Sequence, residues 1–284
     1  MGRNSIRSIQ KLKDDGIPIV MMTAYDATSA RLTEAAHIPI ILVGDTLGMV
    51  VQGHASTIPV TLDQMIYHAS IVSRVTHTAL IVGDLPFMTY SIHAEQAMAT
   101  ATRMMQEGGV GAVKLEGGEA MAPTIRRIVA AGIPVMAHIG LTPQSVATFG
   151  GFRMQGKEEH SARQLITDAL AVQDAGAFAV VLELLPSELT RIITSKLHIP
   201  TIGIGAGVHA DGQVQVFHDV LGLFEEFIPK HTKRYAQIGN LIVQALSQYG
   251  AEVRARQFPT DLHGVNMNAD LVEKLLADDG NETD

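Results

Sequence analysis

The sequence contains no cysteine, and this absence narrows the chemistry that the protein can perform. Disulfide bonds, zinc–thiolate sites, iron–sulfur clusters and a catalytic thiol are all excluded. Long apolar segments are lacking too, because no run approaches the roughly 18 residues that cross a bilayer. Residues 1–7 carry basic side chains but not the apolar region of a signal peptide. We therefore expect a cytoplasmic protein with no membrane partner.

The chain also lacks the excess of positive charge that is typical of nucleic-acid binding. Its formal net charge of −8 disfavours binding to nucleic acid or to an anionic membrane surface. A small anionic substrate is compatible with this charge, because one lysine or metal ion can reverse the local field inside a cleft. The length of 284 residues suits one large domain, and about 250 residues is the usual size of a (β/α)₈ barrel.

Short β-rich segments alternate along the chain with longer helical patterns. Most of these segments are apolar throughout, as expected of parallel strands that are buried on both faces. Helical periodicity between them implies repeated βαβ units, with helices predicted at residues 62–72, 94–104, 165–172 and 238–245. The predicted strands are residues 18–24, 39–44, 79–84, 111–116, 134–138, 178–183, 200–204 and, with a weaker pattern, 220–223.

An Ile-Pro pair stands directly before four of these runs, at residues 17–18, 38–39, 133–134 and 199–200. Proline is tolerated at the first residue of a strand, so the pairs mark a repeated unit. We predict a closed (β/α)₈ TIM barrel, with an open doubly wound sheet as the alternative. Residues 1–260 are assigned to a single catalytic barrel domain. Residues 261–284 form a C-terminal extension, with a short helix at 269–277 and then an acidic, frayed end.

Four of the apolar runs end on a carboxylate, and this is the most informative pattern in the sequence. The four residues are Asp45, Asp84, Glu116 and Glu183. The C-terminal ends of barrel strands hold the active site, so these side chains are expected to converge there. Because ionised carboxylates repel one another, such a cluster needs a cation or a raised pKa. Hard divalent cations such as Mg²⁺ take oxygen ligands of this kind.

Asp45, Asp84 and Glu116 are the predicted metal ligands. The alternative for each aspartate is a cap on the helix or turn that follows it. Three oxygen ligands leave room for water or a chelating substrate around an octahedral ion. The sequence therefore favours a metal-assisted active site.

Lys114, His138 and Glu183 complete the predicted site. Lys114 lies two residues before Glu116 and shares its face of the strand, where it could bind a substrate carboxylate or only form an ion pair. Glu183, held off the metal, is the candidate general base, and a ligand or salt-bridge role is the alternative. His138 closes its own strand as either a structural or a site residue.

Three other segments allow two interpretations each. Tyr25 and Asp26 follow the first strand as either site or scaffold residues. Residues 203–207, Gly-Ile-Gly-Ala-Gly, are too closely spaced for the dinucleotide-binding fingerprint and form either an anion-binding loop or a tight turn. Residues 149–153 resemble a mobile loop over the site, as many surface loops do.

Eight segments, in order over residues 5–260, closely resemble the ketopantoate hydroxymethyltransferase family. They are Thr-Ala-Tyr-Asp at 23–26, Leu-Val-Gly-Asp-Thr-Leu-Gly-Met at 42–49, Gln-Gly-His at 52–54, Asp-Leu-Pro-Phe-Met at 84–88, Lys-Leu-Glu-Gly-Gly at 114–118, His-Ile-Gly-Leu-Thr-Pro-Gln at 138–144, Gly-Gly-Phe-Arg-Met-Gln-Gly at 150–156 and Gly-Ile-Gly-Ala-Gly at 203–207.

The resemblance implies a barrel that binds Mg²⁺, or another divalent cation, through Asp45, Asp84 and, by way of water, Glu116. An α-keto acid would chelate this ion and so lie against Asp45 and Asp84. Thr46 would contact the carboxylate of the keto acid. The family usually has serine at this position, and Thr46 keeps the hydroxyl and adds a methyl group.

The resemblance also implies the reaction. Lys114 would hold the carboxylate of 3-methyl-2-oxobutanoate, with His138 nearby, and Glu183 would remove the proton from C3. The metal-stabilised enolate would then attack the one-carbon unit of the co-substrate 5,10-methylenetetrahydrofolate. The products would be 2-dehydropantoate and tetrahydrofolate, in the first step of pantothenate biosynthesis. Family members form homo-oligomers, commonly decamers.

Two other functions are compatible with such a barrel. One is a metal-dependent enzyme of the phosphoenolpyruvate mutase/isocitrate lyase type, although the cleaving members use a cysteine that this chain lacks. The other is a non-catalytic barrel that binds a keto acid and would have no need of Glu183 as a base.

Overall fold

The computed structural model describes residues 2–223 and 229–278. The chain divides into two compact units, Met1–Ala236 and Gln237–Asp284. The first unit contains the barrel, and the division falls before residue 260, the predicted end of the catalytic domain. The acidic end at residues 279–284 lies outside the described residues.

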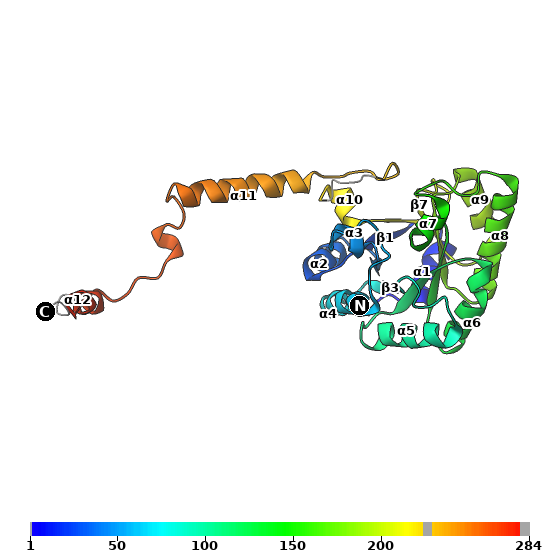
Figure 1. The fold of residues 1–284 in the computed structure, drawn as a ribbon, viewed down its shortest axis with the longest axis horizontal. Coiled ribbons are helices and arrows are strands. Elements are labelled where there is room, and N and C mark those ends of the chain that lie inside the picture. The colour runs from blue at the N-terminus through cyan, green and yellow to red at the C-terminus, as the bar shows by residue number, and fades with distance from the viewer. Residues whose placement is uncertain (1, 224–228, 279–284) are drawn as a thin grey trace. The chain divides into compact units, whose positions relative to one another are not determined.

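The described part of the first unit is a closed barrel of eight strands, each parallel to its neighbours, with β8 pairing to β1 (Figure 1). The (β/α)₈ prediction is therefore confirmed, and the open sheet is excluded. The strands are β1 Ile19–Thr23, β2 Ile40–Val43, β3 Leu80–Asp84, β4 Ala112–Glu116, β5 Val135–Gly140, β6 Ala179–Glu183, β7 Thr201–Ile204 and β8 Gly212–Gln215.

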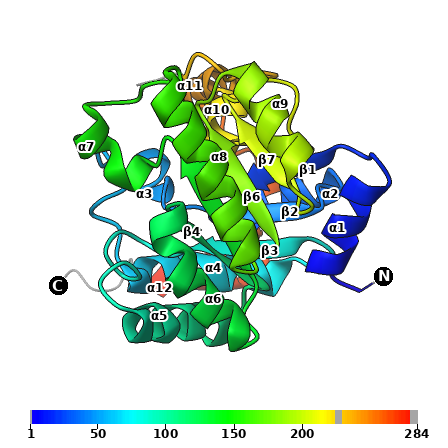
Figure 2. The same cartoon turned by 90° about the vertical axis from the view of Figure 1, so that its right-hand side faces the viewer.

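The larger helices of this unit lie outside the ring of strands (Figure 2). The helices predicted at 62–72, 94–104 and 165–172 are confirmed as α4, α5 and α8, and most of the expected apolar residues are buried. The described helices of the unit are α1 Ile6–Asp14, α2 Ala27–Ala35, α3 Leu47–Val50, α4 Leu62–Val75, α5 Ala94–Gln106, α6 Ala122–Ala130, α7 Val146–Phe149, α8 Glu159–Asp174, α9 Ser187–Lys196 and α10 Phe217–Leu221.

The repeated prolines lie directly before four strands, as predicted. Proline has no N–H to donate to a sheet, but its carbonyl can still accept. The carbonyls of Pro39, Pro134 and Pro200 each accept a backbone hydrogen bond from the neighbouring strand, at 2.9 to 3.0 Å. Each proline therefore begins a strand without leaving a donor unpaired.

The predicted eighth strand at 220–223 is wrong. Residues 217–221 form α10, and the strand lies earlier, at Gly212–Gln215. The search for apolar runs did not predict this strand, because its sequence, Gly-Gln-Val-Gln, is short and alternates apolar with polar residues. Gly212 is required there, since a Cβ would lie 2.2 Å from the carbonyl oxygen of Ile19 in β1. Close approach of two backbones, rather than apolar content, closes the barrel.

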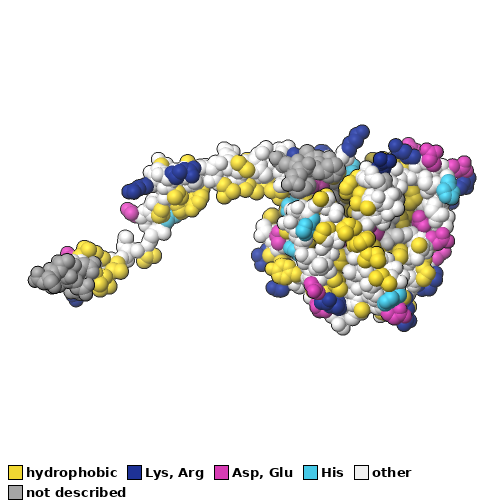
Figure 3. Space-filling model, viewed as in Figure 1, with side chains coloured by type: hydrophobic (Ala, Val, Ile, Leu, Met, Phe, Trp, Pro, Cys, Tyr) yellow, Lys and Arg dark blue, Asp and Glu magenta, His cyan; other side chains and the backbone are white. Residues whose placement is uncertain are grey.

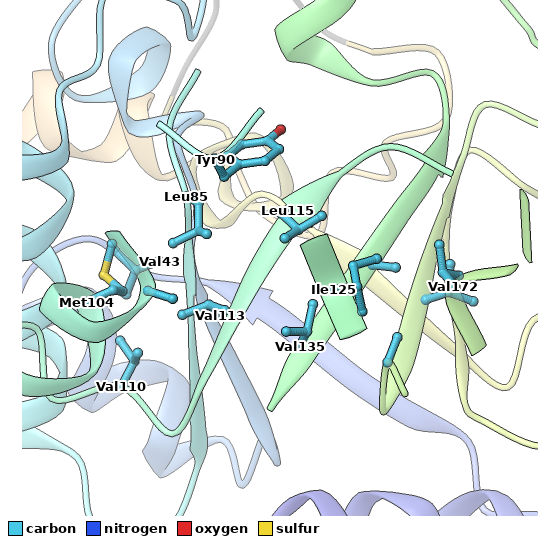
Figure 4. Close-up of a cluster of buried hydrophobic side chains, with 14 of the residues drawn as sticks. Val43, Leu85, Tyr90, Met104, Val110, Val113, Leu115, Ile125, Val135 and Val172 are labelled. Atoms are coloured by element: carbon cyan, nitrogen blue, oxygen red, sulfur yellow. The ribbon is translucent and has the colours of Figure 1, made fainter. Parts of the chain in front are cut away.

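Apolar side chains form two layers on the two faces of the strands. The inner layer includes Ile40, Val82 and Met136. The outer layer lies between strands and helices, where Leu115 of β4 and Ile125 of α6 are both fully buried (Figure 4). Because side chains alternate along a strand, burying Leu115 outward directs Lys114 and Glu116 inward.

The second unit contains α11 Ile238–Arg254, a short 3₁₀ turn at Asp261–His263 and α12 Ala269–Asp278. The helices predicted near 238–245 and at 269–277 are both confirmed. Hydrophobic side chains, including Leu241 and Leu246, are exposed along α11 (Figure 3). None of the described helices is long and apolar enough to cross a membrane.

The outer layer should dominate the stability of the barrel. Ile125→Ala removes a fully buried side chain and should cost about 2–5 kcal/mol of unfolding free energy. The same change at Ile192, which is 40% exposed on α9, should cost far less. Urea unfolding followed by circular dichroism measures both, and equal shifts of the two midpoints would contradict this assignment of the core.

Candidate active site

The predicted site residues converge at the C-terminal ends of β2 to β6. Each of the six charged side chains is less than a tenth exposed, with values from 2% for Asp45 to 9% for Glu183. Burying ionisable groups is costly unless they are paired, so their mutual contacts decide how the site is held. The six are Asp45, Asp84, Lys114, Glu116, His138 and Glu183.

The register of the sheet brings Lys114 against Asp84. The two residues are paired across β3 and β4, and Lys114 Nζ lies 2.8 Å from Asp84 Oδ1. Burial alone lowers the pKa of Lys114, but the surrounding carboxylates outweigh burial and raise it above its ordinary value. Lys114 is therefore a fixed positive charge. Lys114 therefore forms an ion pair, which was one of its two predicted roles, and its partner is Asp84 rather than Glu116.

His138 lies between two carboxylates. The register pairs it with Glu116 across β4 and β5. Its Nδ1 is 3.4 Å from Glu116 Oε1, and its Nε2 is 3.2 Å from Glu183 Oε2. Burial and the charge of Lys114 lower the pKa of His138, but the two glutamates raise it to about 9. A protonated imidazole in contact with both carboxylates holds Glu183 in place, so His138 lies within the charged cluster.

Asp45 belongs to the same network and does not cap a helix. Its backbone N–H donates to Asp84 Oδ2 at 3.1 Å, and its Oδ2 accepts from Gln144 Nε2 at 2.8 Å. The helix that follows has no side-chain cap at its N-terminus. Burial and the charges of Asp84 and Glu116 raise the pKa of Asp45 well above its ordinary value. A nearby cation would relieve this repulsion.

Gln144 and Tyr90 belong to the site but were not predicted as site residues. Gln144 is buried; its backbone N–H donates to Glu116 Oε2, and its Nε2 donates to Asp45 and to the carbonyl of Leu85. The Tyr90 hydroxyl donates to Gln144 Oε1 at 2.7 Å and accepts from the N–H of Glu116 at 3.2 Å. Gln144 stands at the end of the 138–144 segment, which was the only sequence signal for it.

Tyr90 also connects the site to the outer apolar layer. Its ring is labelled within the buried cluster in Figure 4, and its hydroxyl carries the polar contacts to Gln144 and Glu116. The site carboxylates are therefore positioned by the same residue that fills part of the core.

Thr46 and Tyr25 are in contact, whereas Asp26 is scaffold. The hydroxyls of Thr46 and Tyr25 lie 2.7 Å apart, and Thr46 lines the site. Asp26 is exposed and caps α2, because its Oδ1 accepts from the N–H groups of Thr28 and Ser29, each at 2.8 Å. The scaffold interpretation is therefore correct for Asp26, and Tyr25 orients the Thr46 hydroxyl.

Two further segments border the site. Residues 203–204 end β7, and the chain then bends at Gly205, where a Cβ would lie 2.6 Å from Leu184 and 2.9 Å from His231. Phe152 and Met154, from the loop after α7, line a cavity of about 610 Å³ that also reaches Glu183. The prediction that residues 149–153 border the site is thus supported at Phe152.

A sequence model described as Ketopantoate hydroxymethyltransferase matches residues 3–261. The chain belongs to the ketopantoate hydroxymethyltransferase family. The chain is 56% identical to the 3-methyl-2-oxobutanoate hydroxymethyltransferase of Chloroflexus aurantiacus over 98% of both chains. It is 53% identical to the enzyme of that name from Gluconacetobacter diazotrophicus, covering 96% of this chain and 99% of that one. The predicted family and the prediction of an enzyme are confirmed.

Solved structures share the fold at much lower identity. A phosphonopyruvate hydrolase in complex with oxalate and Mg²⁺ matches with a TM-score of 0.60 and 12% identity, over 96% of this chain and 95% of that chain. A 2,3-dimethylmalate lyase of the PEP mutase/isocitrate lyase superfamily matches with a TM-score of 0.54 and 16% identity, over 97% and 95%. These enzymes therefore share the barrel fold with this chain.

The Tyr90 hydroxyl should contribute measurably to stability. Tyr90→Phe leaves the Glu116 N–H and the Gln144 Oε1 without this partner in a buried site, which should cost about 1–3 kcal/mol. Tyr67→Phe, at a residue 64% exposed on α4, is the matched control. Urea midpoints compare the two variants, and an unchanged midpoint for Tyr90→Phe would contradict the network described above.

Proposed function

We propose that this enzyme transfers a hydroxymethyl group from 5,10-methylenetetrahydrofolate to C3 of 3-methyl-2-oxobutanoate. The products are 2-dehydropantoate and tetrahydrofolate, in the first step of pantothenate biosynthesis. The observation that carries the proposal is the pairing of Glu183 with His138 beside the Asp84–Lys114 ion pair. This arrangement sets a candidate base next to a positive charge that suits a carboxylate.

Asp45 and Asp84 are the residues that would hold a divalent cation, and their chemistry fits one. With Lys114 and His138 protonated, the four site carboxylates exceed the positive charges by two. Among the described residues, no three His, Asp or Glu side chains enclose an ion by themselves. Mg²⁺ is usually held by one or two carboxylates, with water and substrate completing its shell. Bound there, Mg²⁺ would supply a Lewis acid for the keto oxygen.

Glu116 suits an indirect role at the metal. Its Oε2 accepts from the N–H of Gln144 at 3.0 Å, and its Oε1 contacts His138. Both oxygens therefore already have protein partners, whereas Asp45 has one oxygen, Oδ1, for which the described residues supply no hydrogen bond. This difference supports Asp45 as a direct ligand and Glu116 as a ligand through water. Both oxygens of Asp84 have partners, Lys114 and the N–H of Asp45, so its role as a ligand follows from the family resemblance and from its position beside Asp45.

Lys114 and Thr46 would bind the substrate carboxylate. Lys114 is the fixed cation of the pocket, and the Thr46 hydroxyl is held by Tyr25. Anchoring the carboxylate directs the isopropyl end of the keto acid toward the remaining wall, where Glu183 lies with Val181 and Ile204. The apolar neighbours suit the two methyl groups on C3.

Glu183 would remove the proton from C3, and His138 would keep its carboxylate directed into the pocket. The C3 carbanion equivalent, an enolate, then forms a bond to the methylene carbon of the folate, and the bonds from that carbon to N5 and N10 break. Water supplies the hydroxyl of the product. The proton from C3 and one from water end on the two folate nitrogens, so the reaction balances.

We also propose that the enzyme works in the cytoplasm as a homo-oligomer, a decamer by the family resemblance. The family resemblance supports the assembly, and sedimentation analysis would measure it. A monomer at working concentration would contradict it.

Exchange of the C3 proton of 3-methyl-2-oxobutanoate tests the base directly. In D₂O with Mg²⁺, wild-type enzyme should incorporate deuterium at C3, as followed by NMR, and EDTA should abolish the exchange. Glu183→Gln should slow exchange by about 10²–10⁴-fold, the usual contribution of a general base. Glu188→Gln, at an exposed position at the start of α9, is the matched control.

Three outcomes of this experiment are informative. Exchange that survives in Glu183→Gln would assign the base elsewhere. Exchange that appears only with folate present would mean that the co-substrate must bind first. Absence of both exchange and turnover would overturn the transferase proposal and favour a mutase-type enzyme or a non-catalytic barrel.

The role of Lys114 can be tested separately. Lys114→Met removes a charge-assisted contact to the substrate carboxylate and should raise the KM for the keto acid by about 10–100-fold. Lys196→Met, at an exposed position on α9, should leave this KM unchanged. Steady-state kinetics at saturating folate measures both, and an unchanged KM in Lys114→Met would leave the lysine only its ion pair with Asp84.

A further inference from the structure

A second cavity adjoins the charged pocket. It has a volume of about 610 Å³, whereas the charged pocket has about 50 Å³. The two share part of their walls, including Thr46, Glu183 and Val216. Glu183 is therefore accessible from both, and a molecule in the large cavity would lie next to a substrate in the small one.

The walls of the large cavity are mainly apolar. Met49 and Val50 line it from α3, Phe152 and Met154 from the loop after α7, and Leu184 from the end of β6. Cavities of 300–1,000 Å³ with apolar walls and a few polar groups are typical of sites for organic ligands. These side chains suit the faces of a flat ring system larger than the keto acid.

Among the described residues, one carboxylate besides Glu183 lines this cavity, that of Asp219. Asp219 of α10 is only 7% exposed, and no described residue donates a hydrogen bond to its side chain. Burial raises its pKa to about 6, and the positive charge of Arg234 acts in the opposite direction. A carboxylate on a cavity wall to which no described residue donates can accept hydrogen bonds from a ligand, so the cavity suits a ligand that brings donors.

The position of Asp219 is fixed by the barrel. The backbone N–H of Phe217, the first residue of α10, donates to Thr23 Oγ1 at the end of β1. Neighbouring His218 packs against the ring of Tyr25, with ring centroids 5.5 Å apart. A side chain held in this way presents its carboxylate in a defined place, as recognition of a specific edge of a ligand requires.

We propose that the large cavity binds the pteridine ring of the folate co-substrate, and that Asp219 accepts hydrogen bonds from its ring N3–H and 2-amino group. This inference rests on the proposed function, which requires a one-carbon donor beside Glu183. A carboxylate paired with two parallel N–H donors gives a strong and directional contact. Apolar walls cover the ring faces, and the shared wall brings the one-carbon carrier next to C3 of the keto acid.

The cavity also offers a place for the anionic tail of the folate. Lys230 is exposed and lines the cavity beside His231, which packs against Gly205. The tail ends in carboxylates, so the ammonium of Lys230 is a suitable partner. The apolar interior of the cavity would bind the flat ring, and the exposed Lys230 at its edge would bind the charged tail.

The test compares Asp219→Asn with the wild-type enzyme. Direct titration with tetrahydrofolate should show at least tenfold weaker binding to the variant, and the KM for 5,10-methylenetetrahydrofolate should rise by a similar factor. The KM for the keto acid should change less than twofold. Asp174→Asn, at an exposed position in the last turn of α8, is the control and should bind tetrahydrofolate like the wild type.

A second ligand separates recognition from general damage to the cavity. An analogue of tetrahydrofolate that lacks the 2-amino group should bind the wild type at least tenfold more weakly than tetrahydrofolate. Asp219→Asn should bind the two ligands within about twofold of each other. A variant that had merely lost its shape would weaken both ligands and keep their ratio, and that result would overturn the assignment.

Failure of this inference and failure of the proposed function give different results. C3 exchange by the wild type tests enolisation, and turnover with 5,10-methylenetetrahydrofolate tests the transfer. If both are present and Asp219→Asn binds tetrahydrofolate as tightly as the wild type, the cavity assignment is wrong and the proposed function stands. If both are absent, and the wild type does not bind tetrahydrofolate, both proposals fail.

Discussion

The burial of six charged side chains at one end of a closed barrel is the constraint on which the rest of the structure depends. Lys114 and Glu116 can enter the interior because the residues that alternate with them, Val113 and Leu115, are buried in the outer layer. The two positive charges are paired locally: Lys114 with Asp84, and His138 with Glu116 and Glu183. The negative charge that remains is the feature of the site that calls for a cation.

The site is rigid because polar contacts join residues that lie far apart in the sequence. Gln144 reaches Asp45 across 99 residues of chain, and Tyr90 reaches Gln144 across 54. These bonds fix the carboxylates relative to one another before any ligand binds. Such preorganisation is what electrostatic catalysis needs, because the groups do not have to reorient as charge develops on the substrate.

Much of the fold and of the charged pocket could be predicted from the sequence, for a physical reason. Parallel barrel strands are buried on both faces, so they read as apolar runs, and a charge at the end of such a run marks the active-site rim. This pattern found Asp45, Asp84, Glu116 and Glu183. It missed β8, because a strand of Gly-Gln-Val-Gln depends on the close approach of Gly212 to Ile19 rather than on apolar content.

Gln144, Tyr90 and Asp219 could not be found by local pattern. An amide, a phenol and an aspartate are ordinary in loops and short helices. Gln144 and Tyr90 have partners that only the folded chain brings together, and the role proposed for Asp219 rests on its place in a cavity wall, where no described residue donates to it. The resemblance to the family covered the segment that contains Gln144 but did not give it a role. The positions of these three residues therefore had to come from the structure.

The proposed function depends on a divalent-cation site that the buried carboxylates would form and the keto acid would complete. Titration with Mn²⁺, followed by electron paramagnetic resonance, measures this directly, because the free ion gives a strong signal that binding removes. The account predicts one bound ion per chain, tighter binding when 3-methyl-2-oxobutanoate is present, and loss of the site in Asp84→Asn. Binding that is weak, non-stoichiometric and indifferent to the keto acid would contradict it.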